Sequence, residues 1–154
     1  MIKQAVQDSN YSVDEMGNVY SRKGRLLKGS VNSSGYRQIF TYGDGENTGS
    51  YLVHRMIWET FKGPVPEGYV VDHINQIKSD NRLENLRILT FQQNLLNREA
   101  KNYIKNGKKW IVRMIQHGIH KYFGTFESEE EAAAKAAIVR EDYFNSLVSQ
   151  NQYK

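Results

Sequence analysis

The stretch that decides the fold is residues 69–98, which read YVVDHINQIKSDNRLENLRILTFQQNLLNR. Its apolar runs at residues 69–71 and 86–89 predict two short strands, because polar and turn-forming residues bound each run. Thr90 is a good N-cap for a short helix over about residues 91–98. The stretch therefore predicts the order strand, polar loop, strand, helix.

Four side chains of this stretch are suited to phosphodiester hydrolysis. His73 suits a general base, because an imidazole ionises at about pH 6.5. Asp72 is a hard oxygen ligand of the kind that Mg²⁺ prefers, and Asn94 can offer a second oxygen without extra charge. Neighbours on an ideal strand point to opposite faces, so Asp72 and His73 share a site only if the strand ends or distorts there. A lone Asp-His pair is more often a polar loop entrance, and it is the combination with Asn85 and Asn94 that favours chemistry.

A helix and a set of strands are predicted before this stretch. Residues 54–61 have helical spacing of apolar side chains, and the GPVP sequence at residues 63–66 predicts the end of that helix. The segment over residues 11–53 reads as strands and turns, with residues 43–49 as an exposed hairpin tip. The pair at residues 54–55, His-Arg, has two interpretations: support of the site and contact with phosphate, or local packing and capping.

The composition excludes several classes of protein. The chain has 154 residues and no cysteine, which rules out disulfide bonds, thiolate zinc sites and a cysteine nucleophile. No apolar run approaches the roughly 18 residues of a membrane span. Residues 1–10 lack the apolar core of a signal peptide. We therefore expect a cytoplasmic protein.

The positive charge is concentrated in one segment. The net charge of the chain is +4, yet residues 101–126 contain six Lys or Arg residues and no Asp or Glu. Residues 127–154 carry an excess of acidic residues. A concentrated positive segment is typical of a protein with a polyanionic partner, although a solvated basic face has the same composition.

The basic segment also has the pattern of a small sheet followed by a helix. Residues 109–115 and 119–126 alternate as two strands, and Ser128 predicts the N-cap, with Glu131 as its capping-box partner, of an alanine-rich helix over residues 129–147. Lys121 falls where an apolar core residue is expected, which leaves the strand register open. The outward side of the sheet would carry Lys109, Ile111, Arg113, Ile115, His120 and Tyr122.

The central stretch and its flanks resemble HNH homing endonucleases of phages and introns. The resemblance covers about residues 51–98. The segments that carry it are Val53-His54-Arg55, residues 63–68, Val71–Asn75, Asp80–Arg87 and Gln93-Asn94. It implies a zinc-free ββα-metal (His-Me finger) core that hydrolyses DNA with a divalent ion, Mg²⁺ or Mn²⁺. In this resemblance His73 is the general base, and Asp72 and Asn94 bind the ion. Asn85 belongs with the catalytic set by bracing the loop that holds His73.

Residues 103–144 resemble the APETALA-type domain of plant ethylene-response factors. The likeness rests on Trp110–Arg113, Tyr122–Phe126 and Glu130–Ala133. It implies a three-stranded sheet that docks in the major groove of DNA, with the acidic helix behind it. Ile111 and Ile115 are less polar than the corresponding positions of the plant domains. The residues expected to contact DNA are Arg55, Lys105, Lys108, Lys109, Arg113, His120 and Tyr122.

The predicted fold class is α+β, with a ββα-metal nuclease core between a small β-rich module and a sheet-plus-helix module. The expected boundaries are residues 1–50, 51–100 and 101–154. The predicted function is site-specific nicking or cleavage of double-stranded DNA by a monomer or homodimer in a bacterial or phage-infected cell, with no membrane partner. The alternatives are a non-catalytic, sequence-specific DNA-binding protein and a nonspecific nuclease.

Overall fold

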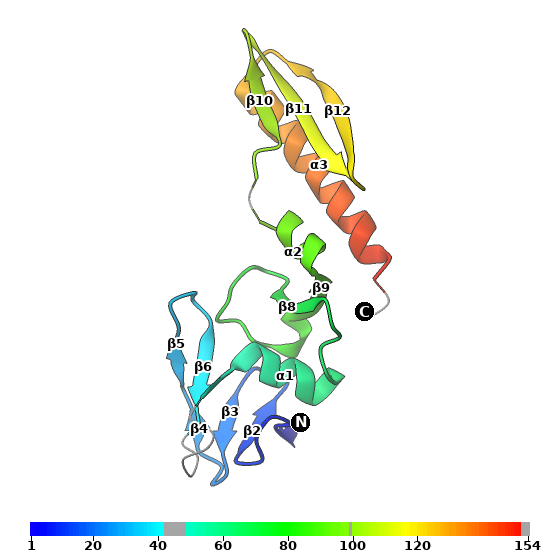
Figure 1. The fold of residues 1–154 in the computed structure, drawn as a ribbon. Coiled ribbons are helices and arrows are strands. Elements are labelled where there is room, and N and C mark those ends of the chain that lie inside the picture. Colours follow the sequence, from blue (N-terminus) through cyan, green and yellow to red (C-terminus); the bar gives the residue numbers. More distant parts are fainter. Residues whose placement is uncertain (42–48, 99, 152–154) are drawn as a thin grey trace. The chain divides into compact units, whose positions relative to one another are not determined.

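The computed structural model describes residues 1–41, 49–98 and 100–151 and has the predicted mixed α+β fold (Figure 1). Most of the hairpin tip expected at residues 43–49 lies outside the described residues. The chain divides into two compact units, Met1–Leu89 and the part from Thr90 onward, and each unit is described by itself.

The first unit contains two small antiparallel sheets, one helix and a strand pair. The first sheet has the order β1-β2-β3-β4 and the second has the order β5-β6-β7. Strand β8 ends at His73, and a polar loop with a short 3₁₀ turn connects it to its partner β9. The bounds are β1 Ile2–Gln4, β2 Tyr11–Asp14, β3 Val19–Ser21, β4 Leu26–Leu27, β5 Ser30–Val31, β6 Arg37–Phe40, β7 Ser50–Leu52, α1 Val53–Lys62, β8 Tyr69–His73, η1 Leu83–Asn85 and β9 Leu86–Thr90.

One hydrophobic core joins the strands and the helix of this unit. Val13 and Val19 of the first sheet are fully buried, as are Met56 and Ile57 of α1, and they cluster with Ile88 of β9. Residues on both sides of the boundary expected near residue 50 therefore share one core. This is why residues 1–89 form one compact unit, whereas the sequence pattern predicted two modules, residues 1–50 and 51–100.

The turn between β2 and β3 packs directly on the loop that follows β8. Gly17 has a φ of +85°, and a Cβ atom built on it would lie 2.8 Å from the backbone carbonyl carbon of Asn81. The backbone N–H of Leu83 donates to the carbonyl of Glu15 at 2.8 Å. The N-terminal sheet thus supports the β8–β9 loop through backbone contacts.

The second unit is a three-stranded antiparallel sheet covered on one face by a long helix. Its strands have the order β10-β11-β12, and Figure 1 shows the sheet in front of α3. Val112 of β11 is buried against Ala132 and Ala136, whose small side chains let the helix approach the sheet closely. The bounds are α2 Phe91–Leu96, β10 Tyr103–Asn106, β11 Lys109–Gln116, β12 Ile119–Phe126 and α3 Glu129–Ser149.

A β-bulge in β12 fixes the register that the sequence left open. Val112 pairs with Gly124, but the next residue, Arg113, pairs with Tyr122, so Phe123 is the additional residue. Phe123 packs into the core beside the helix, while Tyr122 is exposed. Lys121 is opposite the buried Met114 and is itself exposed, which explains why a lysine is tolerated there.

We predict that Gly17→Ala destabilises the first unit more than Gly24→Ala. Both glycines occupy turns of the same sheet with positive φ, +85° and +78°, so the conformational strain of an alanine is similar. A Cβ at Gly24 meets nothing within 4 Å, whereas one at Gly17 meets the Asn81 backbone. The additional cost should be about 1 to 3 kcal/mol in urea unfolding. Equal losses would contradict the packing of this turn on the loop.

Candidate active site

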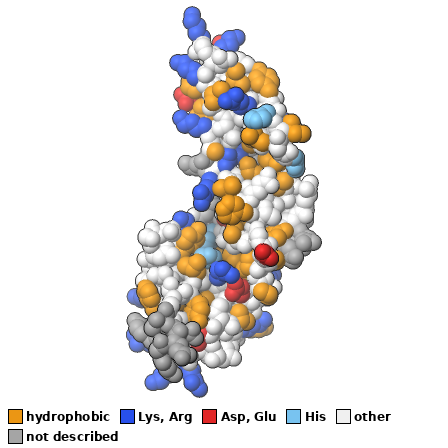
Figure 2. Space-filling model, viewed as in Figure 1, with side chains coloured by type: hydrophobic (Ala, Val, Ile, Leu, Met, Phe, Trp, Pro, Cys, Tyr) orange, Lys and Arg blue, Asp and Glu red, His pale blue; other side chains and the backbone are white. Residues whose placement is uncertain are grey.

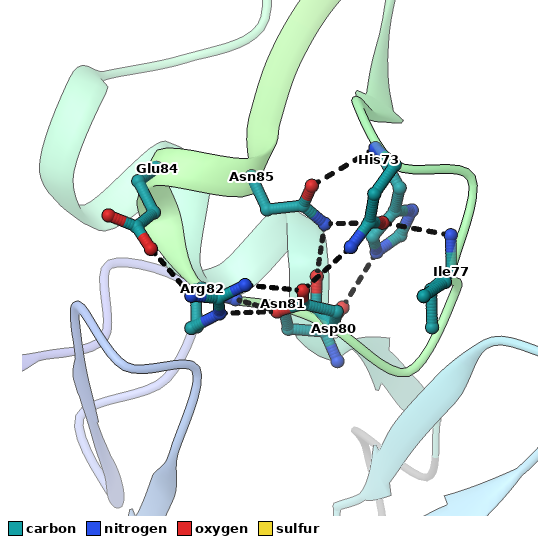
Figure 3. Close-up of polar contacts among 8 residues, drawn as sticks. His73, Ile77, Asp80, Asn81, Arg82, Glu84 and Asn85 are labelled. Carbon is teal, nitrogen blue, oxygen red and sulfur yellow. Dashed lines mark hydrogen bonds and ion pairs between the residues drawn. The ribbon is translucent and has the colours of Figure 1, made fainter.

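His73 is the last residue of β8, and its imidazole is held in one orientation. The side chain is 4% exposed, and Nε2 lies 2.9 Å from Oδ1 of Asn81, which is 3% exposed (Figure 3). An amide oxygen only accepts hydrogen bonds, so Nε2 is the donor in this pair and Oδ1 of Asn81 is the acceptor. The basic lone pair of the ring is then on Nδ1.

The loop around this histidine is closed by Asn85, which lies in the 3₁₀ turn before β9. Its Nδ2 donates to Oδ1 of Asn75 at 2.9 Å and to the carbonyl of Asp80 at 2.8 Å, and its Oδ1 accepts from the N–H of Asn75 at 3.1 Å (Figure 3). The backbone N–H of Ile74 also donates to the Asn85 carbonyl at 2.8 Å. These bonds tie the start of the loop to its end.

A second polar pair stiffens the middle of the loop. Arg82 donates to both carboxylate oxygens of Asp80, each at 2.8 Å, and to Glu84 at 2.6 Å. The Arg82 guanidinium holds the pKa of the Asp80 carboxyl well below its usual range. Asn81, which contacts His73, lies between the two members of this pair and is positioned by them.

Asp72 bonds to a different partner from its neighbour. Its Oδ2 accepts from Nε of Arg87 on β9 at 2.8 Å, and its side chain is 13% exposed. Asp72 and His73 are consecutive residues at the end of β8, and their side chains bond to different partners, Arg87 and Asn81. Sequence reasoning missed Arg87, whose only signal is an arginine within an otherwise apolar strand.

Two aromatic rings lie beside His73, and we call Tyr36, His54 and His73 the ring cluster. The ring centroids of His54 and His73 are 5.1 Å apart, and Tyr36 lies 4.9 Å from His54 and 6.0 Å from His73. Nζ of Lys78 lies 4.7 Å from the centroid of Tyr36. Of the two interpretations of His54, contact with the candidate base favours support of the site.

His54 is buried as a neutral imidazole. It is 6% exposed, and within the part of the chain that the structure describes its Nδ1 has no hydrogen-bond partner. Burial, with smaller contributions from the charges of His73 and Arg55, lowers the pKa of His54 to about 4. His54 is therefore uncharged at neutral pH.

The remaining metal candidate lies in the other unit. Asp72, His73 and Asn85 lie in the first unit, each bonded to a different partner, whereas Asn94 lies on α2 of the second unit. Thr90 and Gln93 form a capping box at the start of α2, which fixes the helical turn that carries Asn94. Among the described residues, no three His, Cys, Asp or Glu side chains gather as a metal-binding group.

The predicted DNA contacts are distributed over both faces of the second unit's sheet. Arg113 and Tyr122 are cross-strand neighbours on the face away from α3, next to the Ile115–His120 pair. Lys105 pairs with Trp110, which packs toward α3, and its Nζ lies 5.9 Å from the Trp110 ring, so it belongs to the opposite face.

The remaining candidates for DNA contact lie at one end of the sheet or in the first unit. Lys108 lies in the exposed turn before β11. Lys109 pairs with Glu127 at 3.0 Å, and both side chains are largely exposed. In the first unit, Arg55 pairs with Glu59 along α1 at 2.8 Å.

Comparison with known proteins finds HNH endonucleases. Residues 51–96 match the HNH endonuclease family. The chain is 32% identical over 97 residues to the SPbeta prophage-derived putative HNH homing endonuclease YosQ of Bacillus subtilis, covering 62% of this chain and 56% of that protein. It is 31% identical over 111 residues to the DNA endonuclease I-HmuI of Bacillus phage SP01, covering 71% and 63%. The chain thus spans less than two thirds of the length of these relatives.

A solved structure is similar over the whole chain. It is described as DNA binding and cleavage by the HNH homing endonuclease I-HmuI, with a TM-score of 0.56 and 25% sequence identity. The match covers 100% of this chain and 93% of that one. Separately, no helix among the described residues is long and apolar enough to cross a membrane.

We predict that His54 makes the first unit less stable in acid. The unfolded imidazole binds a proton at about pH 6.5, but the folded one does so only at about pH 4. Between these values the unfolded chain holds more protons, so the free energy of unfolding falls as the pH drops, by about 3 kcal/mol in all. Urea unfolding at several pH values, followed by Trp58 fluorescence in a Trp110→Phe background, should show this.

The matched variants are His54→Gln, which removes the group, and His120→Gln, which removes an exposed histidine. The first should flatten the dependence between about pH 6.5 and 4, and the second should leave it unchanged. An unchanged slope in His54→Gln would contradict the burial of a neutral His54.

Proposed function

Because residues 51–96 form an HNH endonuclease region of the kind present in homing endonucleases, we propose that the protein is a metal-dependent endonuclease that hydrolyses double-stranded DNA at selected sites. The observation that carries the proposal is the buried imidazole of His73, fixed at Nε2 by Asn81 and adjacent in sequence to the carboxylate of Asp72. A ring that is held at one nitrogen has its other nitrogen available for proton transfer.

His73 is the general base in this proposal. Its Nδ1 accepts a proton from water as the water oxygen forms a bond to phosphorus. The bond from phosphorus to the 3′ oxygen of the neighbouring nucleotide breaks, and that oxygen leaves with the bonding electrons and takes a proton from solvent. Asn85 contributes by closing the loop that carries Asn81, and Asn81 is a positioning residue that keeps Nε2 protonated.

Asp72 and Asn94 would hold the divalent ion. A mostly buried carboxylate, oriented by Arg87, and an amide oxygen are hard ligands that fit Mg²⁺ or Mn²⁺. The chain has no cysteine, which excludes the thiolate ligands of structural zinc sites. When bound, the ion would stabilise negative charge on the phosphate.

The second unit would hold the DNA. Its sheet-plus-helix arrangement supports the resemblance to APETALA-type domains, with Arg113, His120 and Tyr122 on the face away from α3. Lys108 and Lys109 would add phosphate contacts at one end of the sheet, and Lys105 would approach only from the other face. Arg55 would contact phosphate from α1.

The number of strands cut depends on the oligomeric state. One HNH region per chain favours a monomer that nicks one strand. Cleavage of both strands would require a homodimer or two successive nicks.

We predict that His73→Ala abolishes cleavage and preserves DNA binding. Removal of a general base should lower the rate by about 100-fold or more. Nicking of supercoiled plasmid with Mg²⁺, with Mn²⁺ and with EDTA measures the rate, and a gel shift of the same plasmid fragment measures binding. His117→Ala, in the turn between β11 and β12, is the matched control.

Nicking by His73→Ala at the wild-type rate would remove the catalytic assignment. Binding without metal-dependent nicking in the wild type would favour the non-catalytic alternative.

A further prediction concerns Asn81. Asn81→Asp retains an oxygen that accepts from Nε2, whereas Asn81→Leu does not. We expect the leucine variant to lose about 10- to 100-fold in nicking rate with unchanged DNA binding, and the aspartate variant to recover most of the loss. The ¹⁵N shifts of His73 should report protonation at Nε2 in the wild type and the aspartate variant. A predominant Nδ1–H tautomer in the wild type would contradict this assignment.

A further inference from the structure

The face of the β10–β12 sheet away from α3, called here the outer face, combines cations with exposed aliphatic side chains. Alternate residues of β11 form its centre, because Val112 and Met114 between them are buried against α3. Cross-strand neighbours share a face, so the strand register identifies the outer-face residues of β10 and β12. Its members are Ile104, Lys109, Ile111, Arg113, Ile115, His120, Tyr122 and Thr125.

The register arranges this face in rows across the three strands. Ile111 lies between Ile104 and Thr125, whereas Arg113 pairs with Tyr122. The hydroxyl groups of Tyr122 and Thr125 are 2.5 Å apart, which is consistent with both side chains lying on the outer face.

The last row of the outer face pairs Ile115 with His120. An isoleucine therefore lies on each side of the arginine, two residues away along the strand.

Most of the large side chains of the outer face are exposed, and Ile111, which is paired with Ile104, is half-buried. Ile115 is 53% exposed and Ile104 is 40% exposed, while Tyr122 is 63% exposed. Figure 2 shows hydrophobic and Lys or Arg side chains interleaved over this part of the second unit. Residues 101–126 contain no acidic side chain, and the next residue, Glu127, pairs with Lys109 of the outer face at 3.0 Å. The charge suits a polyanion, but phosphate contact alone needs only cations and does not use isoleucine.

The major groove of DNA offers one apolar group to such a side chain, the C5-methyl group of thymine. Residues i and i+2 of a strand are about 7 Å apart, which is about two steps of 3.4 Å along a DNA strand. Ile111 and Ile115 would thus meet bases about four steps apart, with Arg113 between them. Arginine at the centre can donate to the acceptors of a guanine edge.

We propose that the outer face reads thymine methyl groups through Ile111 and Ile115, so that the preferred DNA contains thymines on both sides of the base pair that Arg113 contacts. This proposal rests on the proposed DNA binding of the second unit. It adds the class of sequence that is preferred and the two side chains responsible for the preference.

The test replaces thymine by deoxyuridine, which lacks only the methyl group. Binding of the full chain in EDTA is measured to duplexes of equal length with alternating A·T, alternating A·U or alternating G·C pairs. Each thymine methyl group that is buried on binding should raise the affinity about fourfold. We expect A·T to bind more tightly than A·U by about fourfold or more.

Matched variants separate methyl contact from charge. Ile115→Asn and Ile111→Asn should each reduce the preference for A·T over A·U, with little change in binding to A·U. Lys108→Gln should weaken binding to every duplex equally. It should also lower the number of counterions released on binding, measured from the salt dependence of the affinity, by about one. Equal wild-type affinity for A·T and A·U would overturn this inference and leave the proposed DNA binding intact. Failure to bind any duplex at low salt would overturn both.

Discussion

The hydrogen bond between His73 and Asn81 is the constraint on which the candidate active site depends. Both side chains are almost completely buried, so breaking the bond would leave uncompensated polar groups in the interior. The ring therefore cannot rotate unless the loop changes shape. Asn85 closes that loop from within, and the turn at Gly17 supports it from outside. The orientation of one imidazole is thus determined by contacts that extend to the first sheet.

The ring cluster has a complementary electrostatic role. His54 is uncharged at neutral pH because burial depresses its pKa. A proton gained by His73 therefore meets no positive charge on the adjacent ring, although the two centroids are only 5.1 Å apart. The neutral His54 ring thus packs beside His73 without adding a positive charge to the ring cluster.

The sequence allowed the order of most elements to be predicted, whereas the roles assigned to His73, Asp72, Asn85 and Asn94 stay predictions. The apolar runs around the polar loop, the N-cap at Thr90 and the alternation of β11 are local patterns, and the structure contains the corresponding elements. Asn81 was not predicted as the partner of His73, because several asparagines of one loop have the same local chemistry. Only tertiary pairing distinguishes it from Asn75 and Asn85. The bulge at Phe123 was not predicted either, since its only local signal is Gly124 within a strand.

Long-range packing explains the remaining difference between sequence and structure. The change in composition near residue 50 suggested a module boundary, but Val13 and Val19 pack into the same core as Met56. This shared core means that residues 51–96, which match the HNH endonuclease family, do not form a folding unit of their own. A fragment cut at the start of α1 would expose the buried side of that helix and lose the backbone support for the histidine loop. A graft of residues 51–96 onto another protein would therefore have to include the amino-terminal strands β1–β7 as well.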